Sequence, residues 1–281
     1  MSPGSDVAQR LYSVPGALWE RARQAPRRLL MLDYDGTLAP LRAERERALP
    51  FAGAAQLLAG IAGGGGTTVA VISGRRLQDL ERLMAPEAVH LFAEHGWDRR
   101  LPDGRLVRHA LRPEAEAALQ QAAEEASGWE ERIERKRCSI VLHTRGMAES
   151  AASEIEASCA GAWERLQGAG LRVCRIDGGV ELRAAGHDKG SAVLELLAES
   201  PSATLPVYVG DDATDEDAFR EVRAAGFGLR VGARERRSVA AGRLGGCREV
   251  AAFLEEWLAK VEHRPVRPDA PGGASGARRR A

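Results

Sequence analysis

Short apolar segments alternate with helical patterns along the first third of the chain. Residues 29–32, 67–72 and 89–93 are almost uniformly apolar, and helical patterns occupy 51–61 and 75–84. Strands this short and this apolar are typical of parallel sheets, whose two faces are both covered by helices. The alternation therefore predicts a Rossmann-like α/β fold with a parallel-sheet core.

The same alternation returns in the last third of the chain. Strands are predicted at 206–209 and 227–231, and helices at 189–199, 214–225 and 250–261. Because both ends show one pattern, we expect them to form a single, discontinuous domain.

The middle of the chain follows a different pattern, which predicts a small α+β domain inserted into the core. Its expected elements are a hairpin turn at 102–104, helices at 114–127 and 148–166, and strands near 133 and at 139–143, 171–176 and 180–183. We place the core at 1–108 and 187–264 and the inserted cap at 109–186. Residues 265–281 are rich in Pro, Gly, Ala and Arg, so we expect a disordered tail there.

The composition excludes several classes of partner. The 281 residues are 44% hydrophobic and 28% charged, and the formal net charge is +0, which favours neither nucleic acid nor a membrane as partner. The four cysteines lack metal-ligand spacing, and neither a secretory signal nor a membrane-spanning segment is evident. We therefore expect a cytoplasmic protein, and we expect it to be a monomer.

Lysine is scarce in this chain. Only Lys136, Lys189 and Lys260 are lysines among 40 basic residues, and the others are arginines. A lysine retained against this background suggests a position that needs a compact ammonium group with three donors rather than a planar guanidinium. Chance remains the alternative for any one of the three.

Two aspartates follow the first apolar segment. Asp33 and Asp35 are separated by one residue, so the alternation of a strand predicts both carboxylates on one side, at the edge of the sheet where ligands bind. Gly36 permits a tight turn, after which Thr37 is expected to face a phosphate. An Asp-rich turn that caps the next segment is the alternative, which the full run Asp-x-Asp-Gly-Thr makes less favourable.

A second pair of acids, Asp211 and Asp212, follows the strand at 206–209. Capping of the next helix explains the polar residues from Thr214 to Asp217. It does not explain two adjacent carboxylates before the cap, whose repulsion calls for a cation. A hard, oxygen-liganded ion such as Mg²⁺ fits this requirement.

Candidate phosphate-binding groups lie at two places, one between a strand and the next helix and one at the start of a helix. Ser73 and Gly74 follow the strand at 67–72, and Lys189 opens a predicted helix. Hydroxyl, amide and ammonium groups at such positions are ordinary phosphate contacts. Taken singly, Ser73 is better explained as a helix cap and Lys189 as a solvated charge.

The chain resembles the haloacid dehalogenase superfamily, whose four motifs it matches in order. The matching residues are Asp33-Tyr34-Asp35-Gly36-Thr37, Ser73, Lys189 and Gly210-Asp211-Asp212. The runs Glu94-His95-Gly96, His143-Thr144-Arg145 and 210–219 extend the resemblance to the trehalose-6-phosphate phosphatases, from residue 28 to about 257. That family carries a mobile α/β cap and performs the last step of trehalose biosynthesis.

The resemblance implies roles for the core residues. Asp33 would attack phosphorus and form an aspartyl-phosphate, while Asp35 would act as general acid and then as general base. Mg²⁺ would be held by Asp33, the main-chain oxygen of Asp35, Asp211 and Asp212. The phosphoryl group would be bound by Thr37, Ser73, Gly74 and Lys189.

The resemblance also implies a sugar site. Its members would be Glu94, His95, Gly96, Glu134, Lys136, His143, Arg145 and Glu181. Carboxylates and ammonium groups suit a polyhydroxyl ligand, although charges on an exposed strand are an even alternative for Glu134 and Lys136. Thr144 and Ala184 stand where an aromatic residue and a proline are common in the family, so the chain departs from the family pattern in the cap and not at the reacting groups.

Two other functions stay open. The substrate would otherwise be sucrose phosphate or a glycosyl phosphoglycerate, or the chain would be a non-catalytic sensor of sugar phosphates. The intact set of Asp33, Asp35, Lys189 and Asp211 argues against the sensor, because a retired site has no physical reason to keep like charges together.

Overall fold

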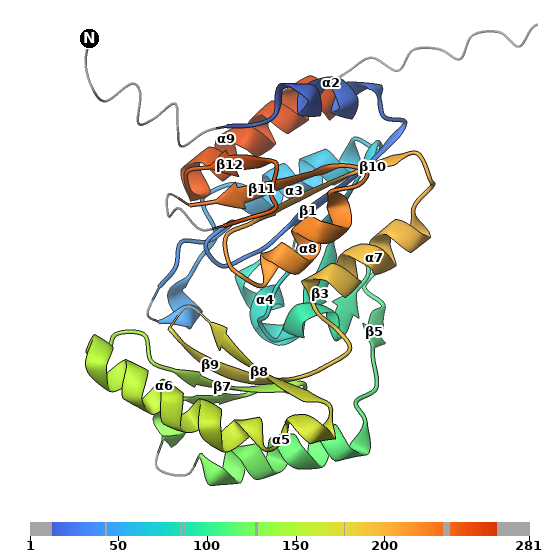
Figure 1. Cartoon of the computed structure of the whole chain (residues 1–281). Coiled ribbons are helices and arrows are strands. Elements are labelled where there is room, and N and C mark those ends of the chain that lie inside the picture. The colour runs from blue at the N-terminus through green and yellow to red at the C-terminus, as the bar shows by residue number, and fades with distance from the viewer. Residues whose placement is uncertain are drawn as a thin grey trace, which may run out of the picture.

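The computed structural model describes residues 13–262 apart from 43, 85, 87, 127–128, 177 and 233–236. The predicted tail at 265–281 lies outside the described residues. The rest divides into a larger part that contains both ends of the described chain and a smaller part formed by its middle (Figure 1).

The larger part is built on an eight-stranded sheet in the order β12-β11-β10-β1-β2-β3-β4-β5. The strands from β12 to β3 are parallel, whereas β3, β4 and β5 are antiparallel. The strands are β1 (Arg27–Leu32), β2 (Thr67–Ile72), β3 (His90–Ala93), β4 (Asp98–Arg100), β5 (Leu106–Arg108), β10 (Thr204–Gly210), β11 (Phe227–Val231) and β12 (Gly242–Leu244). The predicted parallel-sheet core is confirmed, and the hairpin predicted at 102–104 extends the same sheet.

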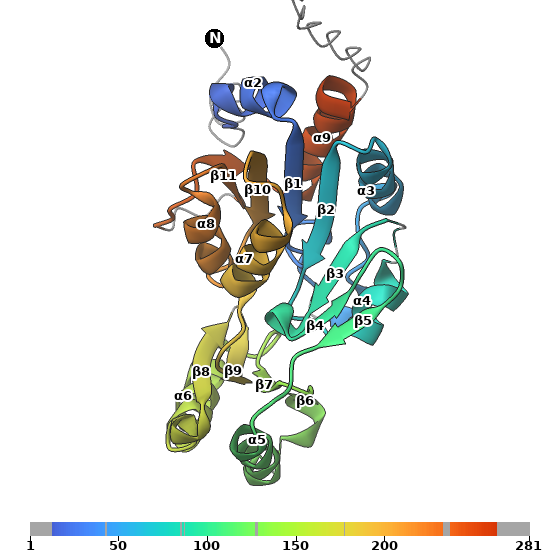
Figure 2. The same ribbon diagram turned by 90° about the vertical axis from the view of Figure 1, so that its right-hand side faces the viewer.

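Helices cover both faces of this sheet (Figure 2). In β1, Leu30 and Leu32 pack with one group of helices, and Leu29 and Met31 pack with the other, because side chains alternate along a strand. The first group is α2 (Gly16–Gln24), α3 (Ala54–Gly63), α4 (Leu77–Leu83) and α9 (Cys247–Trp257), and the second is α7 (Lys189–Glu199) and α8 (Asp215–Val222). This double burial explains why β1 reads as an unbroken apolar run.

The smaller part is the cap, which has its own sheet and its own hydrophobic cluster. Its antiparallel strands run in the order β6-β7-β9-β8. They are β6 (Ile133–Arg135), β7 (Ser139–His143), β8 (Leu171–Ile176) and β9 (Gly179–Ala184). The helices α5 (Pro113–Glu125) and α6 (Glu149–Glu164) pack on this sheet, with Trp163 only 1% exposed between them and the strands.

Several elements differ from the sequence predictions. The helix α3 begins at Ala54 rather than at residue 51, and α8 ends at Val222 rather than at residue 225. The helix α4 begins at Leu77 rather than at residue 75, because Arg75 and Arg76 lie in the turn that precedes it. The helix α2 and the strand β12 were not predicted. Only Leu18 and Ala22 of α2 are buried, and β12 has just 3 residues, so neither has a strong apolar period.

Two histidines meet where the chain passes between the two parts. The rings of His109 and His187 are stacked with their centroids 3.9 Å apart, and the ring of Trp97 lies 4.6 Å from that of His187. Glu195 lies 3.4 Å from His109. The predicted domain boundaries at these two residues stay predictions, but each passage between the sheets carries one member of the stacked pair.

No helix among the described ranges is long and apolar enough to cross a membrane.

The stacked histidines predict a loss of stability in acid. Burial, followed by the nearby His109, lowers the pKa of His187, while Glu195 and Asp188 oppose the shift. The folded protein thus binds this proton less well than the unfolded chain does. The contribution of neutral His187 to the free energy of unfolding is therefore fully present above about pH 6.5 and is lost as the pH drops below that value. We expect His187→Gln to lose less unfolding free energy between pH 7.5 and 5.5 than the wild type, measured by urea unfolding. An equal loss in the two proteins would contradict this role.

Candidate active site

The carboxyl ends of β10, β1 and β2 bring three sequence motifs together. Asp33 follows β1 and its N–H donates to Val209 of β10 at 2.8 Å, which sets Asp33 beside Asp211. Ser73 follows the neighbouring β2. These ends open onto a cavity of about 930 Å³, whose opposite wall belongs to the cap.

A buried lysine pairs with two of the acids at this edge. The Nζ of Lys189 lies 2.8 Å from Oδ1 of Asp33 and 2.7 Å from Oδ1 of Asp215, and the lysine side chain is 3% exposed. The hydroxyl of Tyr208 and the N–H of Asp212 also donate to Asp215, at 2.6 and 2.8 Å. Asp215 is therefore completely paired, and its carboxylate fixes Lys189 against Asp33.

The site still carries excess negative charge. One oxygen each of Asp33, Asp211 and Asp215 lie within 4.8 Å of one another, and a single lysine faces them. Burial, and next the charge of Asp215, raise the pKa of Asp211 to about 7. Burial likewise raises the pKa of Asp33 well above its usual range, although Lys189 opposes the shift.

The donor set fits a divalent cation. Among the described residues, Oδ1 of Asp211 is buried and has no hydrogen-bond partner, although Oδ1 of the more exposed Asp212 accepts the N–H of Ala213 at 2.6 Å. Both oxygens of Asp215 are already engaged, so Asp33 and Asp211 offer the free carboxylate oxygens. A hard cation that prefers oxygen ligands would complete their coordination.

Gly36 makes this approach of the carboxylate possible. Its φ is +76°, and a Cβ at this position would lie 2.0 Å from Oδ2 of Asp211. Any other residue would be strained in the backbone and would also displace the carboxylate. Tyr34 points away into the core, where its hydroxyl donates to the carbonyl of Ala48 at 2.8 Å.

Asp33 and Asp35 face different partners within the same cavity. Asp35 binds the guanidinium of Arg75 through two hydrogen bonds, Nε to Oδ2 at 2.8 Å and Nη2 to Oδ1 at 2.6 Å. Arg75 is itself 3% exposed, and it stacks over the ring of Tyr34 at 5.1 Å. The bidentate pair fixes the direction of the Asp35 carboxylate.

The predicted phosphate ligands lie around Asp33, but not all of them line the cavity. Lys189 and Gly74 do so. Thr37 and Ser73 are 0% and 1% exposed, just behind the wall, and Oγ1 of Thr37 has no partner within the described part of the chain. Oγ of Ser73 accepts the N–H of Arg75 at 3.2 Å.

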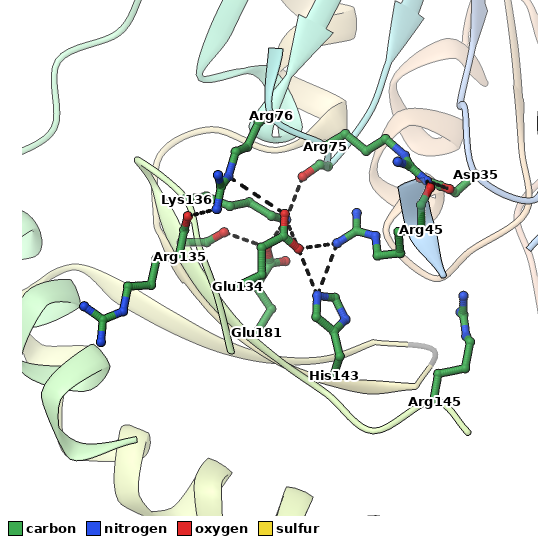
Figure 3. Close-up of polar contacts among 12 residues, drawn as sticks. Asp35, Arg45, Arg75, Arg76, Glu134, Arg135, Lys136, His143, Arg145 and Glu181 are labelled. Atoms are coloured by element: carbon green, nitrogen blue, oxygen red, sulfur yellow. Dashed lines mark hydrogen bonds and ion pairs between the residues drawn. The ribbon is translucent and has the colours of Figure 1, made fainter. Parts of the chain in front are cut away.

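The cap supplies a charged cluster to the opposite wall (Figure 3). Nζ of Lys136 donates to the carbonyl of Gly74 at 2.8 Å and lies 3.5 Å from Glu181. Ser139 donates to Glu181 at 2.8 Å. Nε2 of His143 lies 2.9 Å from Glu134. The wall is lined by Glu134, Lys136, His143, Arg145 and Glu181.

These contacts keep both cap carboxylates ionised. Burial opposes ionisation of Glu134, but the hydrogen bond to His143 and the charges of Lys136 and Arg45 outweigh it and lower the pKa to about 2. Burial opposes ionisation of Glu181 as well, yet the neighbouring His95, Lys136 and Arg183 lower its pKa well below the usual range. Burial lowers the pKa of His95, although Glu181, which lies 3.1 Å from its Nε2, opposes the shift.

The segment Glu94-His95-Gly96 is strained, and only His95 of the three lines the cavity. Their φ angles are 47°, 60° and 109°, all in the left-handed region. The carboxylate of Glu94 accepts the N–H of Cys138 at 2.7 Å and that of Arg137 at 3.3 Å, so it joins the core to the turn between β6 and β7. Gly96 packs against α7, where a Cβ would lie 3.2 Å from that of Ala192.

Three residues of the site were missed by the sequence analysis. The sequence analysis explained Asp215 as a helix cap. The nearby hint in the sequence was Gly210, five residues earlier. A Cβ at that position would lie 2.3 Å from Cγ of Asp215, so glycine leaves room for this carboxylate. Arg75 stands in the Ser-Gly-Arg run but was given no role. Arg45, whose side chain pairs with Glu134, lies in a segment without a recognisable motif.

Loss of the buried charge at Asp215 should destabilise the protein. Asp215→Asn leaves Lys189 with one anionic partner, and breaking a buried pair costs about 3 to 5 kcal/mol. We expect a fall of about 3 kcal/mol in the free energy of unfolding, measured with urea. The matched control is Asp217→Asn in the same helix, whose partner is the exposed Arg220, and it should change stability by about 0.5 kcal/mol or less. Equal effects of the two substitutions would refute the role given to Asp215.

Comparison with known proteins agrees with this geometry. The trehalose-phosphatase family model matches residues 31–241. The chain is 36% identical over 270 residues to an uncharacterized glycosyl hydrolase of Mycobacterium tuberculosis, across 88% of this chain and 20% of that protein. It is 32% identical over 237 residues to a trehalose-phosphate phosphatase of Mycobacterium marinum, across 79% of this chain and 60% of that protein.

The fold also matches a solved structure. The C-terminal domain of C. albicans trehalose-6-phosphate phosphatase superposes with a TM-score of 0.77 at 22% identity, covering 86% of this chain and 95% of that one. The chain spans 20% and 60% of the length of the two curated relatives, so it matches only a part of each. With three quarters of its residues inside the family model, the chain belongs to the trehalose-phosphatase family.

Proposed function

We propose that the chain is a Mg²⁺-dependent phosphatase that hydrolyses trehalose 6-phosphate through a phosphorylated Asp33. One observation carries the proposal: groups suited to a phosphoryl group and groups suited to a sugar line the same cavity. Asp33 and Lys189 lie at its core end, and Glu134, Lys136 and Glu181 lie at its cap end. The family membership and the named phosphatase among the relatives support the substrate.

In the first step, a carboxylate oxygen of Asp33 attacks phosphorus and the bond from phosphorus to the sugar oxygen breaks. Asp35 enters this step in its protonated form and gives that proton to the departing oxygen, so that trehalose leaves as a neutral alcohol. Lys189 has three N–H donors and uses two on Asp33 and Asp215, which leaves one for a phosphoryl oxygen.

In the second step, water attacks the phosphorus of the aspartyl-phosphate, and Asp35 takes the proton of that water. Inorganic phosphate leaves, and both aspartates return to their starting state. The guanidinium of Arg75 holds the Asp35 carboxylate through both steps, so that one carboxyl group serves as acid and then as base. Phosphoryl transfer depends chiefly on such positioning and on charge stabilisation.

Asp33, Asp211, the main-chain oxygen of Asp35 and the supporting Asp212 would hold Mg²⁺. When bound, the cation neutralises charge on the phosphoryl oxygens and on the carboxylates. The excess negative charge at Asp33 and Asp211 and the unpaired Oδ1 of Asp211 support this assignment.

The cap residues would bind sugar hydroxyls. Ionised Glu134 and Glu181 would accept hydrogen bonds from sugar hydroxyls, and Lys136, His143 and Arg145 would donate hydrogen bonds to them. His95 adds one contact from the core. In this proposal Glu94 and Gly96 anchor the cap and pack the strained segment rather than touch the sugar, because the Glu94 carboxylate already binds two backbone N–H groups.

Two alternatives remain as test outcomes: another sugar phosphate as substrate, such as sucrose phosphate or a glycosyl phosphoglycerate, and a sugar-phosphate sensor without activity. We further propose that the chain acts in the last step of trehalose biosynthesis, as a monomer in the cytoplasm. All four cysteines are free, which agrees with a reducing compartment.

Phosphate release is the direct test. Incubation with trehalose 6-phosphate and Mg²⁺ should release phosphate, and excess chelator should abolish the release. Sucrose phosphate and glucosyl phosphoglycerate, assayed in parallel, should react at least tenfold more slowly. Asp33→Asn should remove nearly all turnover while the protein still unfolds cooperatively. Full turnover in Asp33→Asn would exclude Asp33 as the nucleophile, and faster release from another sugar phosphate would reassign the substrate.

Metal binding has a separate readout. Because Mg²⁺ would relieve repulsion between Asp33 and Asp211, saturating Mg²⁺ should raise the melting temperature of the wild type, by linkage of binding to folding. Asp211→Asn should lose most of this rise. Ca²⁺ should also stabilise the fold but support little turnover, since its looser coordination misplaces the reacting groups. Melting temperatures insensitive to both cations would disprove the metal assignment.

A further inference from the structure

A core loop that no motif marks lies between the two halves of the cavity. It includes the 3₁₀ turn η1 (Arg45–Arg47) and lines the cavity with Leu41, Glu44, Arg45 and Glu46. Two anchors hold its backbone: Tyr34 donates to the carbonyl of Ala48 at 2.8 Å, and Arg75 donates to the carbonyl of Arg45 at 2.9 Å.

The side chain of Arg45 leaves the core and contacts the cap. Its Nη1 pairs with Oε2 of Glu134 on β6 and lies 3.3 Å from Nε2 of His143 on β7. Figure 3 shows this guanidinium pointing at both cap residues, with Arg75 and Asp35 on its other side. The side chains of Arg45 and Glu134 are 26% and 20% exposed, so the ion pair is largely shielded from water.

The main chain of Arg45 contacts the group that holds the general acid. Nη2 of Arg75 donates both to the Arg45 carbonyl at 2.9 Å and to Oδ1 of Asp35 at 2.6 Å. A guanidinium is a rigid plane, so fixing one of its N–H groups on a carbonyl also fixes the direction of the others. The carbonyl of Arg45 therefore helps to set the direction of the Asp35 carboxylate.

Resting on the proposed function, we propose that Arg45 is a positioning residue that couples the cap to proton transfer by Asp35. When the cap lies on the core, Glu134 and His143 hold the Arg45 side chain, the turn η1 is fixed, and its carbonyl orients Arg75. When the cap swings away, Arg45 loses both partners and this orientation weakens. The general acid is then set correctly only while the sugar-binding wall is in place, which restrains attack on phosphate esters in the open state.

The leaving group separates this role from others. p-Nitrophenyl phosphate has a leaving group that needs little protonation, whereas benzyl phosphate has an alkoxide leaving group that needs a proton from Asp35. Neither probe carries a sugar. The ratio kcat/KM covers only the steps up to transfer of the phosphoryl group, so the later use of Asp35 as a base does not affect it.

We expect Arg45→Met to lower kcat/KM for benzyl phosphate and for trehalose 6-phosphate about tenfold, and to change that for p-nitrophenyl phosphate less than twofold. The reason is that a well-placed general acid contributes about 10²- to 10⁴-fold and only its orientation is disturbed. Glu134→Gln should reproduce the loss with benzyl phosphate, and the double variant should lose no more than either single one.

The matched control is Arg47→Met in the same turn. The side chain of Arg47 is 79% exposed and its described partner is Glu44, at 2.8 Å. This variant should keep wild-type values with all three substrates. If Arg45→Met does not fold, Glu134→Gln with the two sugar-free probes carries the same test from the cap side.

Each other outcome overturns the inference. Parallel losses with both sugar-free probes would make Arg45 a structural residue, and a loss with trehalose 6-phosphate alone would make it a sugar contact. No loss with any substrate would remove it from the reaction. If the wild type releases phosphate from none of the three esters, the proposed function itself fails, and the inference fails with it.

Discussion

The ammonium group of Lys189 connects three segments that are far apart in the sequence. Asp33 follows β1, Lys189 opens α7 and Asp215 opens α8, and the two ion pairs are 2.8 and 2.7 Å long. In so buried a setting, loss of Lys189 would leave two carboxylates without their cation, and loss of either aspartate would break one of the two buried ion pairs; each change costs several kcal/mol. The same two ion pairs therefore hold α7 and α8 in place and fix the position of Asp33, so that a change in the packing of these helices would also move Asp33.

The cap is attached in a different way, through polar contacts that include main-chain groups and side-chain ion pairs such as Arg45 with Glu134. Lys136 donates to the carbonyl of Gly74, and Glu94 accepts from the N–H of Cys138. The apolar cluster of the cap is separate from those of the core sheet, although Trp97 from the core packs in it. A polar interface without a shared apolar core suits two parts that open and close around a ligand.

The sequence predicted those parts of the site that follow buried strands. Asp33 and Asp211 were found because the ends of parallel strands meet at one edge, a rule that needs no knowledge of side-chain direction. Asp215 and Arg45 were not found, since their roles depend on contacts across long sequence distances. Asp215 also has a local explanation at the start of a helix, and Glu94, expected to bind sugar, binds backbone N–H groups that no local pattern reveals.

For two of the three lysines, the structure gives a physical reason why lysine rather than arginine is present. Lys189 and Lys136 have side chains only 3% exposed, and each ammonium contacts acceptors from two different elements. A compact ammonium with three donors can serve several acceptors in so buried a place, where the larger planar fork of arginine is less suited. Lys260 is 46% exposed and pairs with Glu256 one turn away, so an arginine would serve there equally well. Rarity therefore marked a lysine of the candidate site only where burial also demanded a compact charge, because a solvated position places no such demand on the shape of the cation.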